Sequence, residues 1–180
     1  MRSTTRSGVK KAWPGVYRSA CLAISGAITL AATAGWAQQI GDKSPLLNGT
    51  EKAKLVLVAT GLTSTFAAAV FFCTSMEKGG GNDITLGVEW WSGTSFENDV
   101  TLGEGVVTVS PGDTVTLATH DTLHFQSETV IPGATGASQG AARILATSKK
   151  IVCTAYSVDK DSNPPTFITD VPLYVQGRQK

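Results

Sequence analysis

The sequence has 180 residues, and its 15 Lys and Arg residues nearly balance its 14 Asp and Glu residues, which gives a formal net charge of +1. A chain of this length can form one domain with a sizeable core. The lack of a basic stripe, together with the net negative charge expected after the processing described below, argues against nucleic acid or an anionic lipid surface as a partner.

The first 37 residues have the composition of a secretory signal peptide. All five charged residues of this segment are basic, and an apolar stretch follows at 20–34. That stretch is too short and too rich in Ser, Thr and Gly for a good membrane span. The small residues Gly35 and Ala37 predict cleavage after Ala37. Cleavage after Ala34 is one alternative, and an uncleaved N-terminal anchor is another.

Cleavage after Ala37 would leave residues 38–180 as a single domain of 143 residues. It removes five basic residues and no acidic residue, so ten basic and fourteen acidic residues remain and the net charge becomes −4. We therefore expect an exported protein, periplasmic or extracellular, with no membrane span after cleavage.

Beyond residue 50 the chain is a series of short apolar or alternating runs separated by turn signals, with no convincing helix. Such spacing is typical of an all-β sandwich or barrel. Residues 38–50 are polar, contain Gly and Pro, and are expected to be a lead-in. The expected strands are 54–60, 65–75, 84–91, 106–109, 114–119, 123–131, 141–147, 150–158 and 167–175.

The run at 65–75 is expected to be a central strand buried on both faces. It is almost wholly apolar and lies between Gly61 and the three glycines at 79–81. Its three consecutive alanines leave a helix as an alternative. The run at 84–91 has an alternating pattern, which predicts a half-buried strand with Trp90 on the inner face.

Cys73 and Cys153 are the two cysteines that remain after cleavage, which would remove Cys21. An even number of cysteines in an exported chain favours one disulfide, because compartments outside the cytoplasm are oxidising. Closing a loop of about 80 residues would stabilise the fold by roughly 4 kcal/mol. Two buried free thiols are the alternative, and the absence of a C-x-x-C motif argues against a redox-active pair.

These features predict an antiparallel β-sandwich of about eight or nine strands with one disulfide. The strand pattern and cysteine placement resemble uncharacterised bacterial secreted β-sandwich domains of the immunoglobulin-like type. In such sandwiches a disulfide commonly joins the two sheets beside a buried Trp. The resemblance gives these roles to Cys73, Cys153 and Trp90, and it implies no functional residues.

The segment 107–124 locally resembles cupredoxins. In that family a Pro-Gly-Asp-Thr-Val turn, here residues 111–115, leads through a strand to a copper-binding His, here near His124. A type 1 copper site also needs a second His, a Cys and usually a Met. No His or Met follows Cys153, so the ligand set is incomplete. The resemblance therefore implies a fold without the copper cofactor.

His120 and His124 are the only histidines, and their spacing would suit one metal ion on a helix. On a strand they would lie about 13 Å apart, too far for one ion. A tight turn at 121–122 could bring them together, with Asp121 or Glu128 as a third ligand. The alternative, which we favour, is a polar loop that leads into a strand.

Residues 136–140 match the G-x-S-x-G pattern of a nucleophile elbow, which requires a strand before Ser138 and a helix after it. Here a Pro-Gly loop precedes the pattern, a strand-like run follows it, and both histidines precede Ser138. The spacing of the carboxylates selects no catalytic pair either, so we expect no enzyme. The carboxylates considered are Glu89, Glu97, Asp99, Glu104, Asp113 and Asp121.

Trp91 and Glu89 share the strand face opposite Trp90, so they would lie outside if Trp90 is buried. An exposed indole beside an acid can stack on a sugar ring or anchor a protein contact. Cover by residues 92–99 or by the N-terminal segment is the alternative.

The sequence therefore predicts a secreted, non-enzymatic structural or interaction module whose partner is another protein or a glycan. A carbohydrate-binding module that uses Trp91 and Glu89 is the first alternative. Metal binding through His120 and His124 is the second, and no cofactor is expected.

Overall fold

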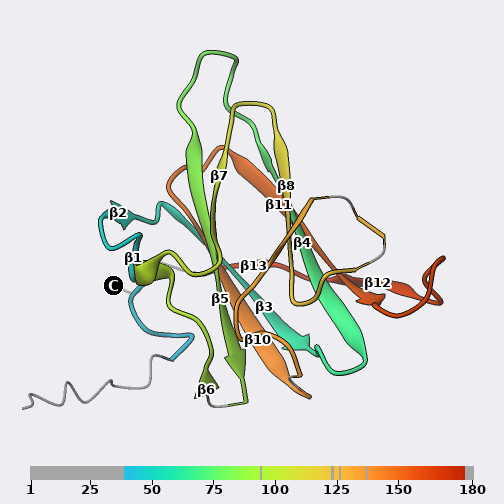
Figure 1. The fold of residues 1–180 in the computed structure, drawn as a ribbon. Coiled ribbons are helices and arrows are strands. Elements are labelled where there is room, and N and C mark those ends of the chain that lie inside the picture. Colours follow the sequence, from blue (N-terminus) through green and yellow to red (C-terminus); the bar gives the residue numbers. More distant parts are fainter. Residues whose placement is uncertain (1–38, 94, 123, 126, 137, 177–180) are drawn as a thin grey trace, which may run out of the picture. The chain divides into compact units, whose positions relative to one another are not determined.

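The computed structural model describes residues 39–176 apart from 94, 123, 126 and 137, and this part of the chain is all-β. The chain divides into two units, Met1–Ala34 and Gly35–Lys180, and the described residues lie in the second. Two mainly antiparallel sheets make up most of this unit (Figure 1). Within the described residues, no helix is long and apolar enough to cross a membrane.

The first sheet has six strands, all paired in antiparallel fashion. Its edge is formed by the last strand of the chain, and β3, β10 and β5 form its centre. The order is β13 (Tyr174–Val175), β3 (Leu55–Leu62), β10 (Gly140–Ala146), β5 (Ile84–Ser92) and β6 (Ser95–Phe96), and β7 (Val106–Val109) also pairs with β5.

The second sheet has five strands, in the order β12 (Ile168–Val171), β11 (Ile151–Asp159), β4 (Ala67–Ser75), β8 (Thr114–Ala118) and β9 (Glu128–Val130). Only β8 and β9 are parallel to each other. The chain alternates between the sheets along β3, β4 and β5, so strands that follow one another in sequence are stacked rather than paired.

The main core lies between the two sheets. Trp90 of β5 is fully buried there, and a Cβ at Gly140 would lie only 2.5 Å from its indole, which explains the glycine at the start of β10. The all-β fold and face-to-face packing are as predicted. Core residues from both sheets include Leu57, Ala59, Ala69, Phe71, Ile84, Leu86, Val88, Trp90, Leu117, Ala142, Ile144, Ile151 and Ala155.

The prediction of a central strand at 65–75 is confirmed by β4, which is buried on both faces. Phe71 and Cys73 face the main core. Val70 belongs to a second apolar cluster, against which Phe72 packs. A helix would have had no polar face to offer solvent, and the three alanines instead fit the crowded centre of the sheet.

The predicted disulfide between Cys73 and Cys153 is present. The two residues lie directly opposite one another on β4 and β11, with their Cα atoms 4.1 Å apart. The bond therefore joins neighbouring strands of one sheet. The position between two sheets that the immunoglobulin-like resemblance suggested is not found, because both cysteines are in the same antiparallel ladder.

The structure differs from the predicted strands in several places. The expected lead-in ends with β1 (Leu46–Leu47), which pairs with β2 (Glu51–Lys52). Among the described residues of the strand expected at 123–131, only those of β9 form a strand, and the loop expected after β5 contains β6. The strand expected at 167–175 divides at Pro172 into β12 and β13, which belong to different sheets. Pro lacks the N–H that a continuous ladder would need.

Candidate functional site

A fully buried ion pair lies on the outer face of the six-stranded sheet. Arg143 of β10 and Glu89 of β5 are opposite one another in the antiparallel register. Arg143 Nε donates to Glu89 Oε2 over 2.5 Å, and neither side chain is exposed to solvent. Such a pair is tolerated best when further hydrogen bonds satisfy its remaining groups. The segment that covers it supplies acceptors for Arg143 Nη1, whereas Nη2 has no hydrogen-bond partner among the described residues.

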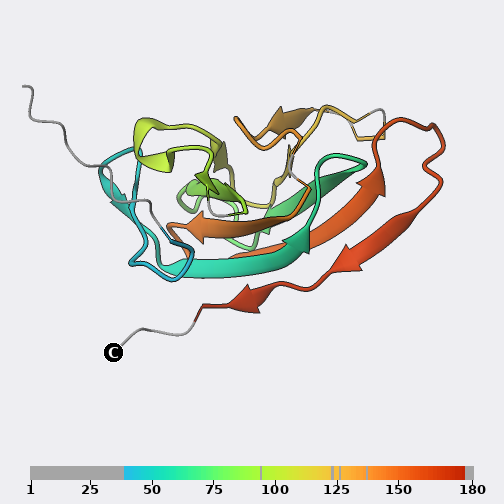
Figure 2. The ribbon, with the colours of Figure 1, turned by 90° about the horizontal axis from the view of Figure 1, so that it is seen from below.

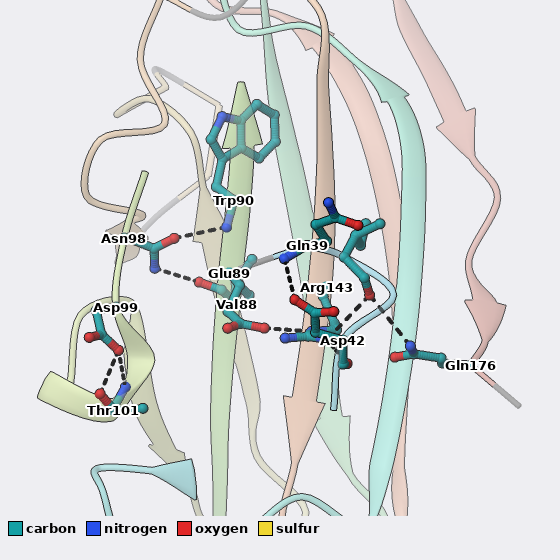
Figure 3. Close-up of polar contacts among 11 residues, drawn as sticks. Gln39, Asp42, Val88, Glu89, Trp90, Asn98, Asp99, Thr101, Arg143 and Gln176 are labelled. Atoms are coloured by element: carbon teal, nitrogen blue, oxygen red, sulfur yellow. Dashed lines mark hydrogen bonds and ion pairs between the residues drawn. The ribbon is translucent and has the colours of Figure 1, made fainter. Parts of the chain in front are cut away.

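Residues 39–44, which we call the N-terminal strap, lie over this pair (Figure 3). Arg143 Nη1 donates to the carbonyl oxygens of Ile40, over 3.2 Å, and Asp42, over 2.7 Å. Gln176 Nε2 donates to the same Ile40 carbonyl over 3.4 Å. One buried guanidinium therefore fixes both the carboxylate beneath it and the backbone above it.

Trp91 lies beside the pair and is itself buried, with 4% of its surface exposed. Arg143 Cζ lies 5.3 Å from the Trp91 ring centroid, within the range of a cation–π contact. Phe96 of β6 packs on the indole at 5.3 Å between centroids. The structure therefore shows the covered alternative: β6 and the N-terminal strap lie over this face, so Trp91 and Glu89 do not form the exposed ligand contact that was also considered.

Asn98 anchors the loop that follows β6, and sequence reasoning did not single it out. Its Oδ1 accepts from the Trp90 amide over 2.8 Å, and its Nδ2 donates to the Val88 carbonyl over 2.7 Å and the Glu104 carbonyl over 3.2 Å. The 3-10 helix η1 (Val100–Leu102) follows at once. A single Asn in a polar loop gives no pattern that would identify this role.

The two histidines lie in the loop after β8 and contact protein groups. His124 Nε2 lies 2.8 Å from the Asp159 carbonyl oxygen, so this nitrogen donates, because a carbonyl can only accept. His120 Nδ1 lies 3.4 Å from Thr119 Oγ1. Burial lowers the pKa of His120, and the charge of Lys160 acts in the same direction.

Glu128, considered as a third metal ligand, has a different role. Its two carboxylate oxygens accept from the Thr122 backbone amide and hydroxyl, each over 2.5 Å, which closes the turn before β9. In the part of the chain that the structure describes, no group of three or more His, Cys, Asp or Glu side chains could hold a metal ion. The metal hypothesis for His120 and His124 gains no support from this arrangement.

The G-x-S-x-G pattern at 136–140 leads directly into β10. Ser138 borders a pocket of about 600 Å³ at the ends of β3 and β5, whose lining is mainly Gly, Ala, Leu and Thr with Gln139 and contains no His. A nucleophile elbow requires a helix after the serine, so this pattern does not form one.

The segment 167–175, which we call the C-terminal edge, runs beside β3 and ends both sheets (Figure 2). β12 is the last strand of the five-stranded sheet and β13 the last of the six-stranded sheet. Among the described strands, none pairs with their outer sides. Four apolar side chains are exposed here, with exposed fractions of 42% for Phe167, 55% for Ile168, 59% for Tyr174 and 69% for Val175.

Sequence reasoning identified this run as a strand but not as an edge. Pro172 was the available signal, because Pro within a strand pattern is typical of an edge. An exposed apolar edge is a template for pairing with another strand.

Comparison with known proteins adds no assignment, since the chain matches no protein-family model, no curated protein and no solved structure.

Proposed function

We propose that this protein is an exported, non-enzymatic structural module that associates with a second copy of itself through the C-terminal edge. The observation that carries this proposal is the exposure of Phe167, Ile168, Tyr174 and Val175 along an edge without a strand partner in the described part of the chain. In strand addition, main-chain hydrogen bonds provide affinity and the side chains provide specificity.

The sequence of the edge favours antiparallel pairing with its own copy. Pairing centred on Val171 places Phe167 opposite Val175 of the second copy, and Ile168 opposite Tyr174 of the second copy. A two-fold axis repeats both contacts, so all four exposed apolar side chains gain an apolar neighbour. Apolar and aromatic cross-strand pairs of this kind stabilise antiparallel ladders.

Charge does not oppose this pairing. Asp170 is the one charged residue of the C-terminal edge, and it faces Pro172 of the second copy. Pro172 removes one donor near the centre. The pairing is therefore expected as two symmetric ladders, each between residues 167–169 of one copy and residues 173–175 of the other.

The disulfide supports the exported location, because such bonds persist mainly in oxidising compartments. The signal-peptide features at 1–37 support it as well, although this segment lies outside the described residues. The intact mass of exported protein should correspond to a chain that begins at Gln38 or Gly35. A mass that retains residues 1–34 would contradict cleavage.

A charge exchange at the edge tests the association. Ile168→Glu places a carboxylate opposite Tyr174 at both ends of the dimer, and the dimer dissociation constant should rise by about tenfold or more. Adding Tyr174→Lys in the same chain restores an attractive pair at both ends and should recover the dimer. Sedimentation velocity over a range of protein concentrations measures both effects.

Val152→Glu provides the matched control. Val152 is an equally exposed apolar residue, at 56%, and lies on β11 rather than on the edge. Its substitution should leave the dimer unchanged. A wild-type protein that stays monomeric at every concentration, or a dimer that Ile168→Glu and Val152→Glu weaken equally, contradicts the proposal.

The carbohydrate-binding alternative has less support. The residues on which it depended, Trp91 and Glu89, are buried beneath the N-terminal strap and β6. A glycan would have to bind a surface that lacks these two side chains.

A further inference from the structure

A pocket of about 740 Å³ lies where β3 begins, between the N-terminal strap, the turn after β10 and the end of β13. This volume is within the usual range of small-molecule sites, about 300–1,000 Å³. Three lysines line it, Lys43, Lys54 and Lys149, together with Asp42 and Ser44. Its remaining lining is mainly aliphatic.

The three lysines lack ion-pair partners within the described residues. Lys150, the residue after Lys149, differs because its ammonium group pairs with Glu77 at 2.8 Å. Hydrogen bonding to Lys150 is the main cause of the lowered pKa of Glu77, and the charge of Lys54 adds to it from a distance. The pocket therefore concentrates positive charge in a chain whose expected mature charge is negative.

The walls of the pocket are held in place before any ligand binds. Arg143 Nη1 holds the Asp42 carbonyl over 2.7 Å. The Lys54 amide donates to the Ala146 carbonyl over 2.7 Å, and the Gln176 amide donates to the Val56 carbonyl over 2.9 Å. A pocket whose backbone is already fixed loses little entropy when a ligand enters.

We propose that this pocket binds a compact polyvalent anion whose charges are carboxylates or phosphates. Ammonium groups act as point charges toward such groups. Lys43, Lys54 and Lys149 would provide the attraction, and the Ser44 hydroxyl would provide a hydrogen-bond donor. This inference does not depend on the association of two copies.

Isothermal titration of the mature protein with citrate and with inorganic triphosphate tests the proposal. Saturable binding at a ratio of one per chain is expected, and its affinity should fall as salt is added, because the charges are exposed. Binding of citrate alone identifies a carboxylate ligand, binding of triphosphate alone identifies a phosphate ligand, and binding of both supports recognition by charge. Failure of both probes to bind overturns the proposal.

Two triple variants with the same change in net charge separate the pocket from the overall charge. Replacing Lys43, Lys54 and Lys149 by Gln should weaken binding by about tenfold or more, as expected for the loss of three exposed charge contacts. The control replaces lysines outside the pocket by Gln, namely Lys52, Lys78 and Lys160, and should retain the affinity. Equal losses in the two triple variants overturn the assignment.

Val175 borders the pocket and also belongs to the C-terminal edge, so the titration is repeated with Ile168→Glu. Equal affinity in the wild-type and Ile168→Glu proteins supports a pocket formed by one chain, whatever the oligomeric state. Binding that is lost with Ile168→Glu overturns the single-chain pocket.

Discussion

The outer faces of both sheets carry an apolar cluster, and that of the six-stranded sheet carries a buried ion pair as well. On the six-stranded sheet, the buried pair Glu89–Arg143 lies under the backbone of the N-terminal strap. On the five-stranded sheet, an apolar cluster includes Val70, and Phe72 packs against it. The Phe72 ring meets Phe125 edge-on at 4.9 Å and Tyr156 at 5.8 Å.

This difference shows what each kind of cover requires. An apolar cluster is non-directional, so its contribution scales with the area buried and falls gradually as side chains are shortened. The ion pair is directional, and removal of one partner leaves an uncompensated charge out of water. The guanidinium also requires carbonyl acceptors, and we infer that it thereby fixes where the strap lies.

Among the substitutions on the two outer faces, Arg143→Met should have the largest effect on stability. It leaves the Glu89 carboxylate buried without its cation and releases the Ile40 and Asp42 carbonyls, so the free energy of unfolding should fall by about 3–5 kcal/mol. Urea denaturation of the oxidised protein measures the change. The double variant Glu89→Leu/Arg143→Met should recover much of the loss, because it removes both charges, and a double variant no more stable than Arg143→Met would contradict this account.

Removal of the disulfide tests the inner face of the five-stranded sheet. Cys73→Ala/Cys153→Ala should lower the free energy of unfolding by about 2–4 kcal/mol, since the bond closes a separation of 80 residues. Wild-type protein in reductant is the control, because it lacks the disulfide but keeps the cysteine side chains, and so separates loss of the bond from the packing change that the alanines cause. If oxidised and reduced wild-type proteins unfold at the same urea concentration, the bond does not stabilise this ladder.

Phe72→Ala tests how much the apolar cluster on the outer face of the five-stranded sheet contributes to stability. Phe72 is only partly buried, so the expected loss is about 2 kcal/mol, below the range of about 3–5 kcal/mol for a fully buried Phe. Phe72→Leu should retain most of the stability, because no group is left without a partner. If Phe72→Leu lowers the free energy of unfolding as much as Arg143→Met does, the apolar cluster does not respond gradually to shortened side chains.

Local patterns in the sequence were enough to predict the longer central strands and the disulfide. The apolar run of β4 and the alternation of β5 are local strand signals, and two cysteines in a chain that is expected to be exported have one possible pairing. The division at Pro172 was not predicted, because the sheet to which each half belongs is decided by non-local pairing.

The candidate sites depend on register and cover, which no local pattern encodes. Glu89 and Arg143 are 54 residues apart, and only the pairing of β5 with β10 places them together. Alternation placed Trp91 correctly on the face opposite Trp90. Whether that face is exposed or covered by residues 92–99 or the N-terminal segment was left open, because it depends on the non-local path of β6 and of residues 39–44.

The smallest expected effect concerns acid sensitivity in the hairpin that leads to the C-terminal edge. Asp159 lies at the end of β11, where its Oδ2 accepts from the Thr166 hydroxyl over 2.6 Å and from the Thr166 amide over 3.3 Å. Its Oδ1 accepts from the Asp161 amide over 3.0 Å. These bonds, the Thr166 hydroxyl first, hold the pKa of Asp159 well below its ordinary value of 3.8.

The folded protein therefore binds a proton at Asp159 more weakly than the unfolded chain does. The stabilisation is complete above the unfolded pKa of about 4 and is lost as the pH falls below it toward the folded pKa. Asp159→Asn removes this contribution at neutral pH, so the variant should lose less stability than wild type when the urea midpoint is compared at pH 7 and about pH 3. Asp83→Asn, at an exposed carboxylate directly before β5, should lose as much as wild type. An Asp159→Asn variant that is as acid-sensitive as wild type would show that protonation of this carboxylate does not couple to folding.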